Sequence, residues 1–327
     1  MKTTKISLSL AVIMFAGALA FTSCKKKDKT AAQEPDSEQS SASDNALAEN
    51  SSNDIVSMGS QVSENSGTLT TFRSNDATAN NELMLAGSCA TIAAGLTGTV
   101  VTSYTVDFGT VATCTGQDGR IRTGKLIYDF TGSPANARYR TPGFKMAVSS
   151  VNYVVDGNAI SVTKTVTNTS PLSIATQTAY AIGYNLTWNI SASLSIVKAN
   201  NGGTITWACN RTKELLNSND PNCYKGQFIA IDWKKAIIKL NGSASGTNNK
   251  GESYTAVATN LVRDFNCVPD LTRPHKHPFT SGTIDYTPGA RALRHIDYGS
   301  GTVYPNAACD FNATVTINGQ TYAITLP

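Results

Sequence analysis

Three histidines are the residues of this chain whose type and spacing come closest to a metal site. His275 and His277 form a His-x-His pair, and His295 follows shortly after. On a strand, His-x-His directs both rings to one side, where Asp285 or Asp297 could supply a further zinc or copper ligand. Prolines on both sides of the pair favour an exposed loop instead. The sequence therefore predicts no metal and no other cofactor, and these histidines are the only metal-ligand candidates we retain.

Five basic residues form the richest cationic region of the chain's second, β-rich part. Arg120, Arg122 and Lys125 lie in "GRIRTGKL", and Arg138 and Arg140 in "ARYRTPG". Arginine matches carboxylate and sulfate groups with two parallel hydrogen bonds, so one interpretation is binding of an anionic glycan. The other is the solvated face of two strands, with charges that protect a sheet edge. We favour the second interpretation, because surface charges of this kind are ordinary.

Motifs for nucleophilic or nucleotide chemistry are weak. The sequence has no G-x-S-x-G and no H-E-x-x-H,. "GRIRTGKL" has the glycine and lysine spacing of a phosphate-binding loop, but Leu126 replaces the magnesium-binding Ser or Thr, and a strand-like alternation follows. Asp107 in "DFG" and Asp297 in "DYG" are predicted to accept backbone N–H bonds at turns next to glycine. Paired carboxylates for glycoside hydrolysis stay open, because their pairing is spatial.

The seven cysteines divide into one plus six. Cys24 lies between an apolar run and a lysine cluster, where Phe21-Thr22-Ser23-Cys24 resembles a bacterial lipobox, whose cysteine carries lipid. The other six are an even set, suited to disulfides in an oxidising compartment. "YTVDFGTVATC" and "RHIDYGSGTVYPNAAC" share an apolar-Asp-aromatic-Gly group before a cysteine, each with another cysteine upstream. The hypothesis from this layout is Cys89–Cys114, Cys267–Cys309 and, by remainder, Cys209–Cys223, although sequence alone does not fix connectivity.

The first 23 residues have the pattern of a secretory signal. Lys2 and Lys5 precede an apolar stretch from Ile6 to Phe21 that is shorter than a membrane-spanning helix,. Cleavage before Cys24 removes two lysines and lowers the formal charge from +4 to +2. So small a charge does not favour nucleic acid as a partner. We expect residues 1–23 to be a lipoprotein signal peptide.

Residues 24–82 are expected to be a lipid-anchored, mostly disordered tether. The segment is rich in Ser, Asn, Asp and Glu and too poor in large apolar residues to offset the entropy of ordering,. One exception is residues 44–62, where Leu47, Ile55, Val56 and Met58 could line a short helix, although Ser and Asn argue against its stability.

Residues 83–327 are predicted to form an all-β domain. In "YAIGYNLTWNISASLSI" (180–196), large apolar residues alternate with Ser, Thr and Asn, so one face is buried and the other is wet,. We expect this long strand to bend at Ala192-Ser193. Asn318-Gly319 predicts a tight hairpin between two alternating strands. The architecture is therefore an antiparallel meander of long hairpins, forming a sandwich or a curled, partly closed sheet. Two smaller sandwiches dividing near residue 200 are the alternative.

An ordered series of segments resembles a family of uncharacterised Bacteroidetes lipoproteins. The resemblance covers roughly residues 85–327 and differs in a longer stretch between Gly301 and Cys309 and in the additional Cys209 and Cys223. It implies an envelope location and a β-rich domain, and carries over no activity. The matching segments are "VDFGT", "DGRIRTGK", "DFTG", "ITW", "RTKE", "GSASGTN", "GESYT", "SGTI", "IDYGSG" and "ATVTINGQTYAITL".

These observations together predict a cell-envelope protein that is not an enzyme. We expect lipid at Cys24 to hold it on the outer membrane, at the periplasmic or the surface face, and the β-domain to bind a glycan or an envelope protein or to play a structural part. The alternative is an envelope glycan hydrolase using paired Asp or Glu on a concave sheet face.

Overall fold

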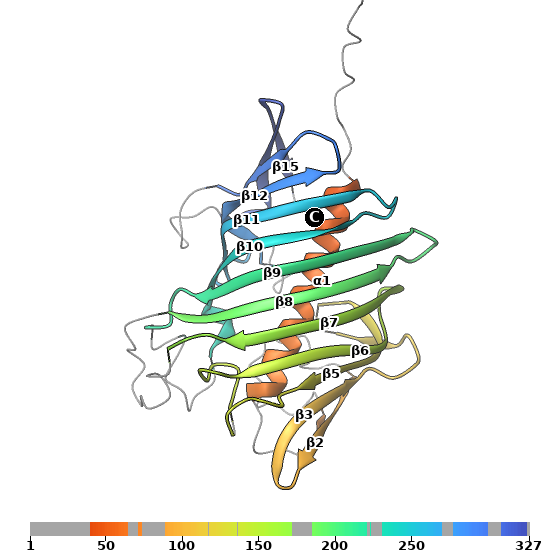
Figure 1. Ribbon diagram of the computed structural model, residues 1–327, viewed down its shortest axis with the longest axis vertical. Coiled ribbons are helices and arrows are strands. Elements are labelled where there is room, and N and C mark those ends of the chain that lie inside the picture. The colour runs from red at the N-terminus through yellow and green to blue at the C-terminus, as the bar shows by residue number, and fades with distance from the viewer. Residues whose placement is uncertain are drawn as a thin grey trace, which may run out of the picture. The chain divides into compact units, whose positions relative to one another are not determined.

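The computed structural model describes residues 40–64, 71–73, 89–116, 118–135, 137–171, 185–220, 223, 231–269, 277–299 and 309–325. They form one α-helix, α1 (Ser40–Glu64), a short 3-10 helix, η2 (Trp233–Lys235), and one large sheet (Figure 1). The strands are β1 (Thr71–Arg73), β2 (Thr91–Thr97), β3 (Val100–Asp107), β4 (Cys114–Thr115), β5 (Ile121–Asp129), β6 (Lys145–Val155), β7 (Asn158–Asn168), β8 (Leu186–Val197), β9 (Thr204–Leu215), β10 (Ile237–Thr247), β11 (Ser253–Asp264), β12 (Phe279–Pro288), β13 (Arg294–Asp297), β14 (Asn312–Ile317) and β15 (Gln320–Thr325).

The sheet is an antiparallel meander. Its order runs from β1 to β15 in chain sequence, and only β4 leaves this path, pairing with β5. The predicted all-β meander of hairpins is therefore confirmed, as one curled, open sheet. The division near residue 200 is wrong, because β8 and β9 pair along their whole length on either side of that turn.

Alternation along the central strands separates a buried inner face from an exposed outer face. Trp188, Ile190 and Leu194 of β8 are buried, whereas Asn189 and Ser191 are exposed. At Ala192-Ser193, where a bend is expected, β8 pairs with β7 and β9 without a register shift, so no β-bulge interrupts the strand there. Full-length partners on both sides keep the strand continuous. Residues 180–184 of the predicted run lie outside the described part of the chain.

Helix α1 is the main departure from the sequence expectation for residues 24–82. It spans Ser40–Glu64, crosses the inner face of the sheet (Figure 1), and buries Ile55, Met58 and Val62 completely. This part of the expected tether is therefore folded, because the sheet supplies partners for a helix that its own propensities would not sustain. Within the described residues, none of the helices combines the length and apolarity needed to cross a membrane.

The predicted turns are present. The backbone N–H of Gly109 donates to Asp107 at 2.9 Å, and that of Gly299 donates to Asp297 at 2.8 Å. Asn318 and Gly319 have φ of 50° and 79° and join β14 to β15 without a register shift. These left-handed conformations are those that a two-residue hairpin turn needs.

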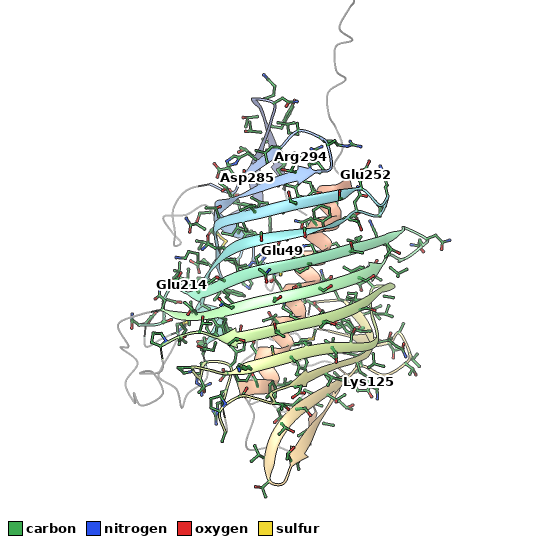
Figure 2. All side chains as sticks on the ribbon, viewed as in Figure 1. Glu49, Lys125, Glu214, Glu252, Asp285 and Arg294 are labelled. Carbon is green, nitrogen blue, oxygen red and sulfur yellow. A yellow bond between two sulfur atoms is a disulfide. The ribbon has the colours of Figure 1, made fainter. Side chains whose placement is uncertain are left out.

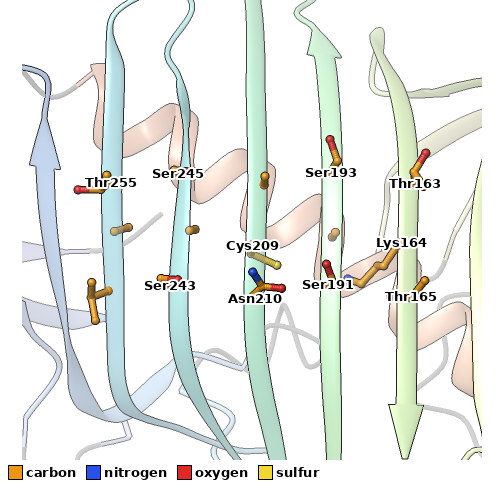
Figure 3. Close-up of a pocket in the computed structure, with 15 residues that line it drawn as sticks. Thr163, Lys164, Thr165, Ser191, Ser193, Cys209, Asn210, Ser243, Ser245 and Thr255 are labelled. Carbon is orange, nitrogen blue, oxygen red and sulfur yellow. The ribbon is translucent and has the colours of Figure 1, made fainter.

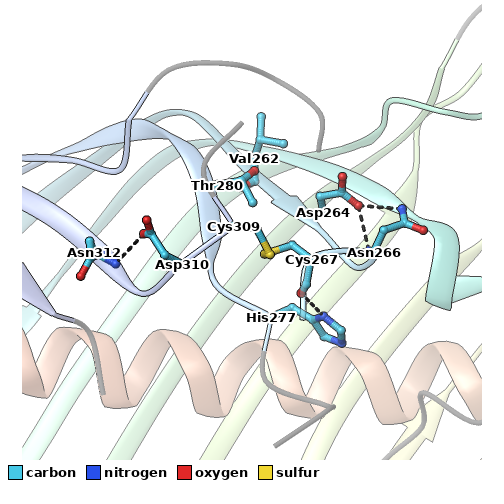
Figure 4. Close-up of a disulfide and its surroundings, with 9 residues drawn as sticks. All are labelled: Val262, Asp264, Asn266, Cys267, His277, Thr280, Cys309, Asp310 and Asn312. Carbon is cyan, nitrogen blue, oxygen red and sulfur yellow. Dashed lines mark hydrogen bonds between the residues drawn. A yellow bond between two sulfur atoms is a disulfide. The ribbon is translucent and has the colours of Figure 1, made fainter. Parts of the chain in front are cut away.

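Two of the three hypothesised disulfides are confirmed. Cys89 bonds to Cys114, and Cys267 bonds to Cys309 (Figure 4).

The third pairing is wrong, because Cys209 and Cys223 are both free and buried. Cys209 faces inward on β9, six residues before the strand ends at Leu215, or about 20 Å along it,. Cys223 lies in the turn beyond that end, where its N–H donates to the carbonyl oxygen of Asp220 at 3.0 Å. The even number of cysteines therefore does not mean that all six are paired: two bridges and two free thiols account for them.

Candidate binding site

The inner face of the sheet is occupied by ion pairs with α1. Lys198, in the turn after β8, lies 2.7 Å from Asp44. Arg211 of β9 donates from Nη2 to both carboxylate oxygens of Glu49, at 3.1 Å each. Figure 2 places Glu49 on α1, over the central strands of the sheet. Further along, Asp54 pairs with Arg120 and Glu64 with Arg140. The sheet therefore supplies a row of cations to the acidic side chains of the helix.

Hydrogen bonds to uncharged groups of the helix complete this docking. Lys164 of β7, which is 2% exposed, donates from Nζ to the carbonyl oxygen of Ser52 at 2.8 Å and to its hydroxyl at 2.6 Å. Burial lowers the pKa of Lys164 to about 8. Trp207 donates from Nε1 to the amide oxygen of Asn45 at 3.1 Å, and the Tyr128 hydroxyl donates to the Ile55 carbonyl at 3.0 Å. Ser52, Asn45 and the Ile55 carbonyl of the helix are thus hydrogen-bonded although they are buried,.

Lys213 is held by aromatic rings. Its Nζ lies 4.5 Å from the ring centroid of Trp233, 5.2 Å from that of Tyr139 and 5.4 Å from that of Trp188. Burial lowers the pKa of this lysine to about 7. The rings stabilise the charged form through cation–π attraction, but they replace water only in part. This lysine therefore packs against aromatic side chains of the core and does not line the outer face of the sheet.

The outer face of the same strands carries a shallow depression of about 630 Å³ (Figure 3). It spans β7 to β11, and we call it the outer groove. Two rows of outward side chains line it, aligned across strands by the sheet register. The first row is Thr163, Ser193, Ala208, Ser245 and Thr255, and the second is Thr165, Ser191, Asn210, Ser243 and Val257.

The chemistry of the outer groove is neutral hydrogen bonding. Its outward side chains are all exposed and none is charged. None of its hydroxyl or amide groups bonds to another group in the described chain, whereas Thr206 and Thr247, on the same face beside it, share a hydrogen bond at 2.7 Å. Neighbouring strands lie about 4.8 Å apart, so hydroxyl or amide groups recur at that spacing, except at Ala208 in the first row and Val257 in the second,. The arrangement suits an extended ligand that carries hydroxyl groups.

The candidate metal residues are not brought together. His277 donates from Nδ1 to the carbonyl oxygen of Cys267 at 2.9 Å (Figure 4) and packs on Phe265. His295 lies on the outer face, with Nδ1 2.6 Å from Asp285. Among the described residues, His295 and Asp285 are therefore the one pair of the expected metal ligands that lie together, and His275 lies outside the described residues. Over the described ranges, His, Cys, Asp and Glu form no group of three that could hold a metal ion.

Both interpretations of the basic region are wrong for Arg122 and Arg140, which are buried. Arg140 is completely buried and pairs with Glu64 of α1. Arg122 is 1% exposed and donates to both oxygens of Asp118, at 2.8 and 2.6 Å. With Arg120, these side chains hold the inner structure instead of a glycan.

Lys125 fits the expected solvated surface. It is half exposed and pairs with Asp107 at 2.9 Å. Arg138 is partly buried in the segment before β6, where its backbone N–H donates to the Thr141 hydroxyl at 3.0 Å.

Sequence reasoning missed the inward-facing cations of the central strands. Lys164 alternates in step with the buried Val162 and Val166 of β7, so its side chain points to the inner face. Arg211 does so with Cys209 of β9. A charge at a buried position of an alternating strand needs a buried partner, and this was the available signal.

Comparison with protein-family models, with curated proteins and with solved structures finds no match to this chain.

Proposed function

We propose that this protein is a lipid-anchored binding module of the cell envelope, whose outer groove takes a neutral glycan. The observation that carries the proposal is the pair of register-aligned rows of unengaged hydroxyl and amide side chains in that groove. Each such group donates or accepts hydrogen bonds, and sugar hydroxyls do both. The inner face is taken up by α1, so the outer face is where the central strands are open to a ligand.

Anchoring, and with it the expected outer-membrane location, rests on the lipobox-like pattern that ends at Cys24. A lipid on this cysteine would hold the domain against envelope polysaccharide, where weak contacts repeated along a chain add up. Labelling cells with a palmitate analogue tests the anchor. Label should be lost in Cys24→Ala, and unchanged label would contradict this part of the proposal.

The alternative, a glycan hydrolase with paired carboxylates on a concave face, has less support. The described carboxylates that enter the inner face from α1 are Asp44, Glu49, Asp54 and Glu64, and each pairs with Lys or Arg. An acid catalyst needs a carboxyl group that has a raised pKa and can reach the substrate. Burial raises the pKa of Asp54, but its carboxylate is engaged with Arg120 under the helix rather than open to a ligand.

Binding is tested with the neutral polysaccharide fraction of the envelope and the purified full chain. The double variant Ser191→Ala/Asn210→Ala removes two adjacent hydrogen-bonding groups from the second row. Since a net hydrogen bond contributes ~0.5–1.5 kcal/mol, affinity should fall about tenfold. Thr206→Ala, on the same strand and face as Asn210 but outside the outer groove, is the matched control and should bind like the wild type. Equal binding by all three proteins would contradict the proposed site.

A further inference from the structure

Strand β15 ends the sheet and lacks the usual edge protection. Within the described residues it pairs on one side only, with β14. Its sequence, Gln-Thr-Tyr-Ala-Ile-Thr, contains no charge and no proline, and its register with β14 has no bulge. Natural proteins protect edges with short strands, charges, prolines or bulges.

The opposite edge of the sheet has this protection. There β1 has three residues and ends with Arg73, and the β2–β3 pairing shifts register between Gly95 and Leu96. The contrast shows that the openness of the β15 edge is specific to that strand.

The hairpin register determines which backbone groups of β15 face outward. Ile317 and Gln320 flank the two-residue turn, so they exchange both hydrogen bonds, and every second pair does the same,. The Thr316–Thr321 pair then belongs to the other kind, in which side chains come closer. Its hydroxyl oxygens are 2.8 Å apart, which agrees. Consequently Thr321, Ala323 and Thr325 direct their N–H and C=O groups away from β14.

We infer that β15 pairs with β15 of a second copy of this chain, in antiparallel register about Ala323. A two-fold axis at Ala323 places Thr321 opposite Thr325 of the other copy, so each outward N–H and C=O finds a partner. The same register places Tyr322 opposite Ile324. Tyr322 is 51% exposed, and an aromatic residue opposite a β-branched one is a favourable cross-strand pair,.

The choice of a second copy follows from this self-complementarity. Because β15 carries no charge, two copies meet without like-charge repulsion. At the two-fold axis, Ala323 of one chain lies opposite Ala323 of the other, and the small methyl groups leave room for this approach. The join continues one sheet into the other, and the outer groove of each copy, centred on β7 to β11, stays uncovered by the pairing.

A single cysteine tests this register directly. Residues opposite each other in a hydrogen-bonded pair have Cα atoms about 5.5 Å apart, inside the range that a disulfide spans. Ala323→Cys should therefore form a disulfide with its own copy under mild oxidation and run at doubled mass on a non-reducing gel. Thr321→Cys is the matched control. In this register the two cysteines at position 321, one in each chain, are offset by four residues along the strands, or about 13 Å, which is too far for a disulfide.

A proline variant tests whether the edge itself makes the dimer. The N–H of Ala323 points away from β14, so Ala323→Pro removes no hydrogen bond within the chain and should fold. Analytical ultracentrifugation of the purified chain should show a dimer for the wild type and a monomer for Ala323→Pro. Thermal unfolding should show that the Ala323→Pro monomer is still folded. A monomeric wild type, a dimeric Ala323→Pro, or cross-linking of Thr321→Cys as efficient as that of Ala323→Cys would overturn the inference.

Discussion

Replacing Glu49 of α1 by leucine should leave a buried guanidinium without its carboxylate. The side chain of Arg211 is 4% exposed and that of Glu49 is 10% exposed, and two hydrogen bonds of 3.1 Å join them. Removing one member of a buried ion pair costs roughly 3–5 kcal/mol, because the other charge stays desolvated. Glu49→Leu and Arg211→Met should each lower the free energy of unfolding by about that amount.

The double variant separates the pair from the packing around it. With both charges gone, no uncompensated charge is left, so the loss should be much smaller than the sum of the single losses, with a coupling of at least about 2 kcal/mol. Urea unfolding followed by tryptophan fluorescence measures this, and Trp207 is a suitable reporter because its indole N–H donates to Asn45 of α1,.

A pair on the outer face is the matched control for this cycle. Lys239 and Glu214 lie 2.6 Å apart on neighbouring strands, with side chains 27% and 23% exposed. Partly exposed pairs contribute about 0–1 kcal/mol, so Glu214→Leu should change stability little. If Glu49→Leu cost no more than Glu214→Leu, and the double variant were simply additive, the description of α1 as a docked helix would be refuted.

Three further predictions concern titration and cysteines. Burial lowers the pKa of Lys164 from 10.5 to about 8, so between these pH values the unfolded chain binds more protons than the folded chain,. The free energy of unfolding should therefore rise by about 3 kcal/mol as the pH rises through this range. Urea titrations at a series of pH values should show this rise in the wild type and not in Lys164→Met. Burial raises the thiol pKa of Cys209 and of Cys223, so a thiol reagent should modify neither in the native chain and both after denaturation; failure to modify them after denaturation would mean that they are oxidised,. Replacing Cys89 and Cys114 by alanine opens a loop of 25 residues and should cost about 3.5 kcal/mol in the same urea assay, whereas an unchanged midpoint would argue against that bridge,.

The strands were predictable because their alternation is a local signal. A strand such as β8 buries every second side chain, and the period of two appears in the sequence without knowledge of its neighbours,. Asp107, Asp297 and the Asn318-Gly319 turn were predictable for the same reason, since their hydrogen bonds reach only nearby residues.

Helix α1 was not predictable because its partners are distant in sequence. Lys164 lies 112 positions from Ser52, and Arg211 lies 162 positions from Glu49. Helix propensity cannot anticipate such contacts, and a Ser- and Asn-rich acidic segment with few large apolar residues has the composition of a disordered chain. The inward-facing cations of the sheet were the complementary signal. They indicate a helix partner only when they are considered together with the acidic residues of 40–64.

The outer groove was not predictable because its side chains look like any solvated strand face. Ser, Thr and Asn at alternate positions are what a half-buried sheet presents to water. Only the register, which sets Ser193 beside Ala208 and Ser191 beside Asn210, turns five separate strands into two continuous rows. Register depends on pairing across the whole sheet, which no single strand encodes.

The most direct test of the proposed binding role is a titration of the purified full chain with the neutral polysaccharide fraction of the envelope, at low and at high salt. Binding should be saturable and change little with salt, because the outer groove carries no charge,. It should be lost in Ser193→Trp, which fills the groove at an exposed position. Binding that Ser193→Trp leaves intact, or binding only to anionic fractions with a steep loss at high salt, would contradict the proposed binding role.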